Sequence, residues 1–261
     1  MLDSGSTDRT VEIAHEMGAT VHHNPFVSFG QQRNWAIDHI ACRHQWHFHL
    51  DADERFTPAL LKEIAHEIGP NGLRSQNSAY LVPSKMIFLG KWLRYAGGYP
   101  AYQMRLFHRE RCRFIDFGHG QREDTTGPVA RLRQPYEHYN FSKGLYDWFI
   151  KHNRYSDQES AQAIAVRAEP KFKIGEVWSN DPIVRRRALK EMSFYVRGRS
   201  LWRFVDMYIR RGGWLDGSAG FHYCVMISSY EYWTELKIRE REGNWLTQTN
   251  LLSERMAREN I

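Results

Sequence analysis

Cysteine is scarce in this sequence, and no apolar run is long enough to cross a bilayer. The 261 residues contain three cysteines, Cys42, Cys112 and Cys224. An odd number without paired spacing argues against a disulfide framework and fits a reducing compartment. The longest apolar-leaning stretch, Phe221 to Trp233, contains Glu231 and several hydroxyl side chains. It is shorter and more polar than the roughly 20 apolar residues that a transmembrane helix needs.

Acidic residues are fewer than basic ones, and this imbalance narrows the class of partner. Asp and Glu number 30 against 36 Lys and Arg, which gives a formal net charge of +6. A basic surface favours anionic partners such as nucleotides and phospholipid headgroups. No RNA-binding or zinc-finger signature accompanies the charge, so we expect no nucleic-acid partner. The aromatic content of 14% with nine Trp suits sugar stacking or a membrane surface, and core packing accounts for it equally well.

Residues 1–70 alternate between short apolar segments and helical patterns. Leu2-Asp3 resembles the end of a buried strand, residues 20–23 and 46–50 predict two further strands, and helices are expected after each. This β-α-β-α-β-α order predicts an α/β fold with a mostly parallel, doubly wound sheet and flanking helices. Ligands in such sheets bind at the carboxyl ends of the strands, where Asp3 and Asp51 are expected.

The rest of the chain divides into a mixed region and a helical tail. Residues 79–132 predict short strands between Gly and Pro turns, whereas helical patterns dominate from Phe141 onward. We therefore expect a nucleotide-binding and catalytic domain over residues 1–140. Residues 141–261 are expected to form a helical C-terminal extension with a role in membrane or acceptor contact.

An acidic turn, Asp51-Ala52-Asp53-Glu54, follows the predicted strand at 46–50. An Asp-x-Asp turn at a strand end places two carboxylates on one side, and hard oxygen ligands suit Mg²⁺ or Mn²⁺. The ion would then stabilise charge on a leaving nucleoside diphosphate. The pattern therefore predicts a metal site at Asp53 and Asp51, although a solvated acidic turn alone also gives this tripeptide.

Three motifs in order resemble glycosyltransferase family 2: the stretch from Leu2 to Thr10, the stretch from Phe29 to Ala36, and the acidic turn. The resemblance implies a GT-A fold and transfer of a sugar from a nucleotide-sugar donor, expected to be a UDP-sugar, with inversion. It further implies that Asp3 and Ser6 bind the nucleotide, with Asp3 at the base or ribose. It assigns Arg33 to closing the nucleotide pocket, Asp51 to the ribose and Asp53 to the metal.

The stretch from Gly118 to Asp124 contains the candidate general base. Inverting transfer needs a carboxylate that takes the proton of the attacking hydroxyl. Members of the family place this acid after the central sheet, often as His-Glu before a glycine. Glu123 matches that acid. Arg122 stands in place of the His, which leaves Asp124 as the alternative base.

Two segments of the helical tail, residues 151–156 and 213–220, resemble the subgroup that builds lipopolysaccharide cores and related surface glycans. This resemblance implies a lipid-linked or lipopolysaccharide-type acceptor and a cytoplasmic enzyme held peripherally at the inner face of the membrane. An aromatic segment with basic edges suits such an anionic surface, and a core-packed helix with solvated Arg is the alternative. The residues concerned are Trp202, Phe204, Tyr208, Trp214, Arg197, Arg199, Arg203, Arg210 and Arg211.

The expected family pattern begins about 30 residues earlier, with one more strand and helix that contact the nucleotide. We therefore expect Met1 to be an internal start and the first βα unit to be missing. A truncated, non-catalytic glycosyltransferase-like protein is one alternative. A nucleotidyltransferase, which also pairs Asp residues with Mg²⁺ on an α/β sheet, is another. This sequence lacks a Gly-rich phosphate loop, which the missing unit would then have to carry.

Overall fold

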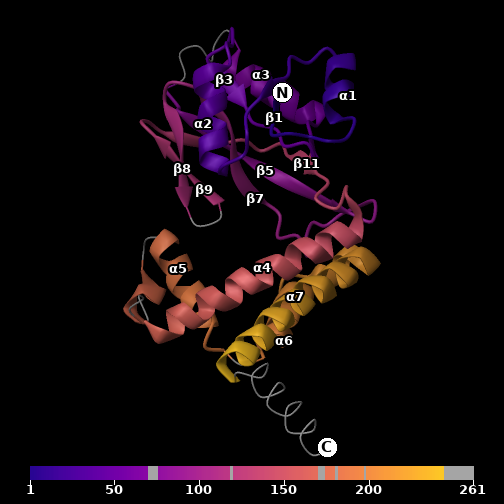
Figure 1. Ribbon diagram of the computed structural model, residues 1–261, viewed down its shortest axis with the longest axis vertical. Helices are drawn as coiled ribbons and strands as arrows, with labels where there is room; N and C mark the ends of the chain where they lie inside the picture. The colour runs from indigo at the N-terminus through magenta and orange to yellow at the C-terminus, as the bar shows by residue number, and fades with distance from the viewer. Residues whose placement is uncertain (70–75, 118–119, 170–173, 180–181, 197, 244–261) are drawn as a thin grey trace, which may run out of the picture. The chain divides into compact units, whose positions relative to one another are not determined.

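The computed structural model describes residues 1–69, 76–117, 120–169, 174–179, 182–196 and 198–243. The chain forms two compact units, which are described separately below (Figure 1). The first unit contains residues 1–85 and 100–138, and the second contains residues 86–99 and 139–261. The expected domains of residues 1–140 and 141–261 are functional assignments and stay a prediction.

The first unit combines short strands with three helices. Its strands are β1 (Leu2–Asp3), β2 (His22–His23), β3 (Trp46–Phe48), β4 (Glu54–Arg55), β5 (Ala79–Phe88, whose last three residues belong to the second unit), β7 (Ala101–His108), β8 (Cys112–Phe117), β9 (Gly120–Thr125), β10 (Val129–Arg131) and β11 (Tyr136–His138). Its helices are α1 (Thr10–Glu16), α2 (Phe29–His39) and α3 (Pro58–Ile68). The α/β class that the sequence predicts is confirmed.

Strand pairing divides the described strands of this unit into three groups. β1 and β2 pair in parallel as a two-stranded sheet, as the β-α-β pattern predicts. The main sheet has the order β3-β7-β5-β11-β4, with β10 parallel to β5. From β3 onward the other assigned directions are antiparallel, namely β3 with β7, β5 with β7 and β4 with β11. β8 and β9 form an antiparallel hairpin, which the sequence analysis did not predict.

Helices α2 and α3 cover opposite faces of the main sheet. Neighbouring residues of a strand point to opposite faces, and β5 illustrates this alternation. Ala79 packs in a core cluster with Ile37 of α2, whereas Tyr80 packs in a second cluster with Leu60 of α3. The sheet is therefore the middle layer between two helical layers, and β3 leads to the acidic turn at its end.

Side-chain caps set the start of both covering helices. The Ser28 hydroxyl accepts a hydrogen bond from the backbone N–H of Gln31 at the start of α2, and Thr57 does the same for Leu60 at the start of α3. Pro58 occupies the first turn of α3, where its fixed φ angle suits a helix and its missing N–H costs nothing. α3 is therefore a helix that follows the predicted strand at 46–50, as the sequence predicts.

The second unit is mainly helical. Its helices are α4 (Gly144–Ala168), η2 (Ile174–Trp178), α5 (Pro182–Ser193), α6 (Arg199–Phe204), the π-helix η3 (Val205–Arg210), η4 (Gly213–Asp216) and α7 (Gly217–Gly243). Helices α4 and α7 lie side by side, and the ammonium group of Lys237 joins them by donating to Asn153 and Ser156 (Figure 1). The end of β5 pairs antiparallel with β6 (Lys91–Trp92) in this unit. The predicted helical C-terminal part is confirmed.

Two glycines allow the turn before α7 to pack closely. A Cβ atom on Gly220 would lie 2.2 Å from the carbonyl oxygen of Gly213, and one on Gly213 would lie 2.7 Å from the carbonyl oxygen of Met207. Both neighbours are backbone atoms, which cannot rotate away as a side chain can. The glycines at these positions are therefore required for the packing of η3 and η4 on α7.

We expect Gly220→Ala to destabilise the second unit because its methyl group overlaps the backbone at Gly213. Overpacking of this kind costs about 1–3 kcal/mol. Gly175→Ala is the matched control, since a Cβ atom on Gly175 meets no atom within 4 Å. Urea unfolding of both variants measures the difference. Equal midpoints for Gly220→Ala and the unmodified protein would contradict the close packing.

Candidate functional site

The acidic turn between β3 and β4 is closed by two reciprocal hydrogen bonds. The backbone N–H of Asp51 donates to the Glu54 carboxylate at 3.0 Å, and the backbone N–H of Glu54 donates to the Asp51 carbonyl at 3.0 Å. Glu54 therefore acts inside the turn, and its side chain is fully buried. This arrangement leaves Asp51 and Asp53 as the acidic side chains with access to solvent, with 49% and 34% of their side-chain surfaces exposed.

Arg105 of β7 supports this turn from the protein interior. Its side chain is 4% exposed, and its Nη2 donates to Glu54 and, at 2.8 Å, to the Asp51 carboxylate. Burial lowers the pKa of Arg105, but the two carboxylates outweigh burial and raise it, so the guanidinium stays charged. Burial raises the pKa of Glu54, and Arg105 opposes that shift. One buried cation thus connects both acidic residues.

Arg33 of α2 reaches the same turn from another element. Its Nη2 lies 3.4 Å from Asp51, its Nη1 lies 3.1 Å from Nδ1 of His49, and its guanidinium lies 5.5 Å from the centre of the Phe114 ring. Burial, with a further contribution from Arg33, holds the pKa of His49 well below its usual value. His49 is therefore neutral at pH 7, and its Nδ1 accepts the hydrogen bond from Arg33 because a guanidinium can only donate.

Asp53 is the carboxylate of this turn that lies beside a histidine. Its Oδ2 lies 3.4 Å from Nε2 of His138 on β11. Both oxygens of Asp51 face guanidinium groups instead. Among the described residues, no three His, Cys, Asp or Glu side chains are grouped to hold a metal ion by themselves. One or two carboxylates with phosphate oxygens suffice for Mg²⁺, so the donor set at Asp53 fits such an ion.

Asp3 organises the turn that follows β1. Its buried carboxylate accepts hydrogen bonds from the backbone N–H groups of Gly5 and Ser6, at 2.9 and 3.1 Å, and from the Ser6 hydroxyl. These bonds, with the Ser6 hydroxyl as the largest contributor, lower the pKa of Asp3 to about 2. His23 lies 3.3 Å from the same carboxylate. Asp3 and Ser6 are thus joined in one rigid, ionised turn.

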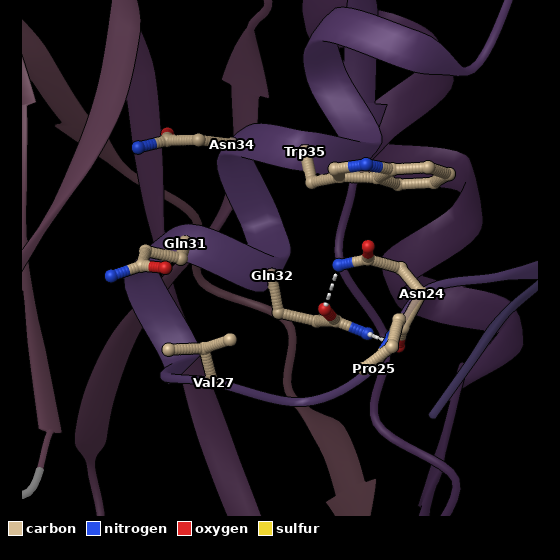
Figure 2. A pocket seen from close by; sticks show the side chains of 7 residues that line it. All are labelled: Asn24, Pro25, Val27, Gln31, Gln32, Asn34 and Trp35. Carbon is tan, nitrogen blue, oxygen red and sulfur yellow. Dashed lines mark hydrogen bonds between the residues drawn. The ribbon is translucent and has the colours of Figure 1, made fainter. Parts of the chain in front are cut away.

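A cavity of about 470 Å³ lies at the start of α2 (Figure 2). Its lining consists of Asn24, Pro25, Val27, Gln31, Gln32, Asn34 and Trp35. Gln32 bonds Asn24 through both of its amide atoms and donates to Ser4 of the Asp3 turn at 2.8 Å. Figure 2 shows Trp35 and Val27 on either side of this amide pair. The cavity borders the Asp3 turn, and neither Asp51 nor Asp53 lines it.

The hairpin β8–β9 separates the two candidate bases onto opposite faces. Glu123 pairs with Phe114, and Asp124 pairs with Arg113. Directly paired residues share a face of the sheet, and neighbours along a strand point to opposite faces. Glu123 therefore lies on the face of Phe114, near Arg33; burial lowers the pKa of Arg33, and the Glu123 carboxylate is among the charges that oppose this shift. Asp124 lies on the other face, and both acids are exposed. Gly118 and His119 lie outside the described residues.

Sequence reasoning missed Arg105, the buried role of Glu54, and His49 as a partner of Arg33. Arg105 stands within the apolar run from Met104 to Phe107. A cation inside a buried strand needs a carboxylate partner, because an isolated buried charge is very costly. The signal was therefore present in the sequence, but the distance of 51 residues between Arg105 and Glu54 concealed the pair.

We expect Arg105→Met to destabilise the first unit by about 3–5 kcal/mol because it leaves Glu54 buried without its cation. The double variant Arg105→Met, Glu54→Gln should recover part of that loss, since it removes the unpaired charge as well. Arg9→Ala, which removes an exposed cation paired with Glu12, is the control and should change little. Urea unfolding measures all three. If the losses of unfolding free energy from the two single substitutions simply add in the double variant, Arg105 and Glu54 do not interact as a buried pair.

Comparisons with known proteins show which sequences this chain resembles. Residues 1–116 match the family model described as glycosyl transferase family 2. Over 93% of this chain and 83% of the relative, the sequence is 23% identical to a lipopolysaccharide core biosynthesis glycosyltransferase, LpsC, of Rhizobium meliloti.

Uncharacterized glycosyltransferases of Rickettsia bellii and Rickettsia felis are each 36% identical over 66 residues, or 25% of this chain. Those matches span only 22% and 23% of the two relatives' own lengths. Residues 1–116 therefore resemble glycosyl transferase family 2, and the chain resembles, over most of its length, a glycosyltransferase of lipopolysaccharide core biosynthesis.

Proposed function

We propose that this protein transfers a sugar, with inversion and with help from a metal ion, from a nucleotide-sugar donor to a lipid-linked or lipopolysaccharide-type glycan. The observation that carries this proposal is the arrangement at the end of β3. An accessible carboxylate, Asp53, stands beside Asp51, which two arginines hold in place. Such a turn presents a metal ligand to a diphosphate, with the Arg33 guanidinium beside it.

We assign binding of the nucleotide-sugar donor to the acidic turn and to the turn at Asp3. We assign Asp53 to a Mg²⁺ or Mn²⁺ ion, with Asp51 held back from direct ligation by Arg33 and Arg105. Such an ion would neutralise charge on the departing diphosphate. The rigid turn at Asp3 and Ser6 is assigned to the nucleoside of a UDP-sugar. Asp3 supports this role by holding Gly5 and Ser6, which are exposed, in a fixed turn.

Glu123 is the proposed general base. In the transfer step the acceptor oxygen forms a bond to the anomeric carbon as its proton passes to the Glu123 carboxylate. The bond from that carbon to the diphosphate breaks, and the nucleoside diphosphate leaves with the electron pair. Attack from the face opposite the leaving group gives inversion. We choose Glu123 over Asp124 as the base because Glu123 lies on the same face of the hairpin as Phe114, near Arg33.

Peripheral attachment to the inner face of the cytoplasmic membrane is part of the proposal. The structure contains no helix, among the residues searched, that is long and apolar enough to cross a bilayer. Trp202 and Trp214 are exposed, whereas Phe204 and Tyr208 pack on Phe221.

The arginines of this predicted membrane surface are less free than the sequence suggested. Arg210 and Arg211 pair with Asp206, and Arg199 pairs with Glu231. Arg197 lies outside the described residues. Membrane contact through this segment therefore depends more on the exposed Trp side chains than on uncompensated arginine charge.

Two alternatives are separated from this function by simple assays. A non-catalytic glycosyltransferase-like protein would bind nucleoside diphosphate without hydrolysing or transferring the donor sugar. A nucleotidyltransferase would consume nucleoside triphosphate and release pyrophosphate. Incubation with a panel of nucleotide sugars and nucleoside triphosphates, followed by product analysis, distinguishes the three.

We expect Asp53→Ala to remove the Mn²⁺ dependence of UDP binding while the protein stays folded. The substituted side chain is partly exposed, so its loss should leave the core intact. Asp38→Ala, which removes an exposed acid from α2, is the control and should retain the dependence. Calorimetric titration with UDP, with Mn²⁺ or with a chelator, gives the readout. An unchanged affinity of Asp53→Ala in Mn²⁺ would exclude the metal role.

We expect Glu123→Gln to lower the rate of transfer by about 10²–10⁴-fold, because general base catalysis contributes that much. UDP binding should be unaffected. Asp124→Asn is the matched control, since it neutralises the neighbouring acid on the opposite face. Steady-state rates of both variants decide the assignment. Loss of turnover in Asp124→Asn with normal turnover in Glu123→Gln would reverse it.

A further inference from the structure

A loop of the second unit, Lys91 to Tyr99, is held rigid by a single buried carboxylate. Asp216 accepts hydrogen bonds from three successive backbone N–H groups, those of Arg94, Tyr95 and Ala96, at 3.2, 2.9 and 2.7 Å. Asp216 is buried, so these bonds are shielded from water. Consecutive N–H groups around one anion form a concave, well-ordered backbone nest. The side chains of this loop are therefore presented in a fixed arrangement.

Cations and aromatic rings are interleaved on this loop. The guanidinium of Arg94 lies 5.6 Å from the Trp92 ring centre and 5.7 Å from that of Tyr95. The rings of Trp92 and Tyr99 meet edge to face at 5.0 Å. Arg94 and Tyr95 are exposed, and Trp92 and Tyr99 are half-buried. The loop thus offers ring surface and positive charge side by side.

Lys91 of this loop and Arg211 each lie close to a glycine, where the absence of a side chain leaves space. A Cβ atom on Gly217 would lie 3.0 Å from the ammonium nitrogen of Lys91. One on Gly98 would lie 3.4 Å from Nη1 of Arg211. Both glycines have positive φ angles, of 68° and 69°, which side-chain-bearing residues rarely adopt. The positive φ angles at Gly98 and Gly217 therefore go together with the close approach of the Arg211 and Lys91 side chains.

The local charge is positive. In the part of the chain that the structure describes, neither Lys91 nor Arg94 forms an ion pair. Arg211 shares the carboxylate of Asp206 with Arg210, so one anion compensates two cations. The negative charges of Asp206 and Asp216 are outnumbered by the four cations Lys91, Arg94, Arg210 and Arg211. This group of charges leaves positive charge available to an anionic ligand.

We propose that the loop from Lys91 to Tyr99, together with Arg211, binds a saccharide that carries a phosphate or carboxylate group. Aromatic rings stack on the apolar faces of sugar rings, and Lys and Arg bind the anionic substituent. A lipid surface fits less well, because Trp92 and Tyr99 are half-buried and pack against each other, and the exposed ring, that of Tyr95, carries a polar hydroxyl. This proposal rests on the proposed function and specifies its acceptor as an anionic glycan.

Calorimetric titration of the full chain with glucose 6-phosphate, glucose and inorganic phosphate tests the proposal. We expect glucose 6-phosphate to bind at least about tenfold tighter than glucose, because hydrogen bonds to charged groups carry that much affinity. Arg94→Ala and Lys91→Ala should each weaken glucose 6-phosphate binding about fivefold or more. Tyr95→Ala should weaken the binding of glucose 6-phosphate but leave the binding of inorganic phosphate unchanged. All substituted side chains are exposed, so folding should be preserved.

Arg239→Ala is the matched control for loss of one positive charge. Arg239 lies 22 residues beyond Gly217 on the same helix, which places it about 33 Å away at a rise of 1.5 Å per residue. Its substitution should not change the affinity for glucose 6-phosphate. An equal loss in Arg239→Ala and Arg94→Ala would mean that the basic surface acts without a site, and would overturn the proposal.

UDP binding in the presence of Mn²⁺, measured on the same variants, separates this proposal from the proposed function. Normal UDP binding without any glucose 6-phosphate binding would overturn the loop site alone. Glucose 6-phosphate binding that depends on Arg94, without UDP binding, would support the loop site while the proposed function fails. Co-sedimentation with phosphatidylglycerol vesicles completes the test. Arg94-dependent vesicle binding without glucose 6-phosphate binding would assign the loop to lipid and overturn the saccharide site.

Discussion

The buried pair of Arg105 and Glu54 is the interaction on which the candidate site depends. Glu54 closes the acidic turn through the backbone N–H of Asp51, and Arg105 holds both carboxylates from within the main sheet. Burying a charge is favourable only when its partners are fixed, and here the partners come from β7 and from the turn between β3 and β4. The position of Asp53 at the surface follows from this internal support, since the turn cannot shift without breaking the pair.

Much of the first unit could be predicted because its signals are local. Caps at Ser28 and Thr57, the proline at Pro58 and the alternation before Asp51 each depend on residues within a few positions of one another. Pairing over long separations could not be predicted in this way. The hairpin β8–β9 is the main example: its register separates Glu123 from Asp124, and the sequence alone left both open. The faces on which two adjacent acids lie can be told apart only when the pairing with the neighbouring strand is known.

In the second unit, too, local sequence patterns predicted helices but not the contacts between side chains. Its helices α4, α5 and α7 lie in the part of the chain from Phe141 onward, where helical patterns predicted a helical extension. Their side-chain partners did not follow from those patterns. The arginines near residue 210 were expected to face a membrane, yet Asp206 lies one helical turn away and pairs with two of them. The segment from Met86 to Tyr99 belongs to this unit, although it precedes the helices by about 50 residues in the chain.

The carboxylate of Asp216 also has a consequence for how this protein can be altered. Its three hydrogen bonds go to consecutive residues, Arg94 to Ala96, and the glycines around it allow no added side chain. A loop exchanged from a relative would keep its shape only if the segment from Gly213 to Gly220 were exchanged with it. These two stretches, more than 110 residues apart, therefore form a single module for chimaera design, and insertions within either one should be tolerated poorly.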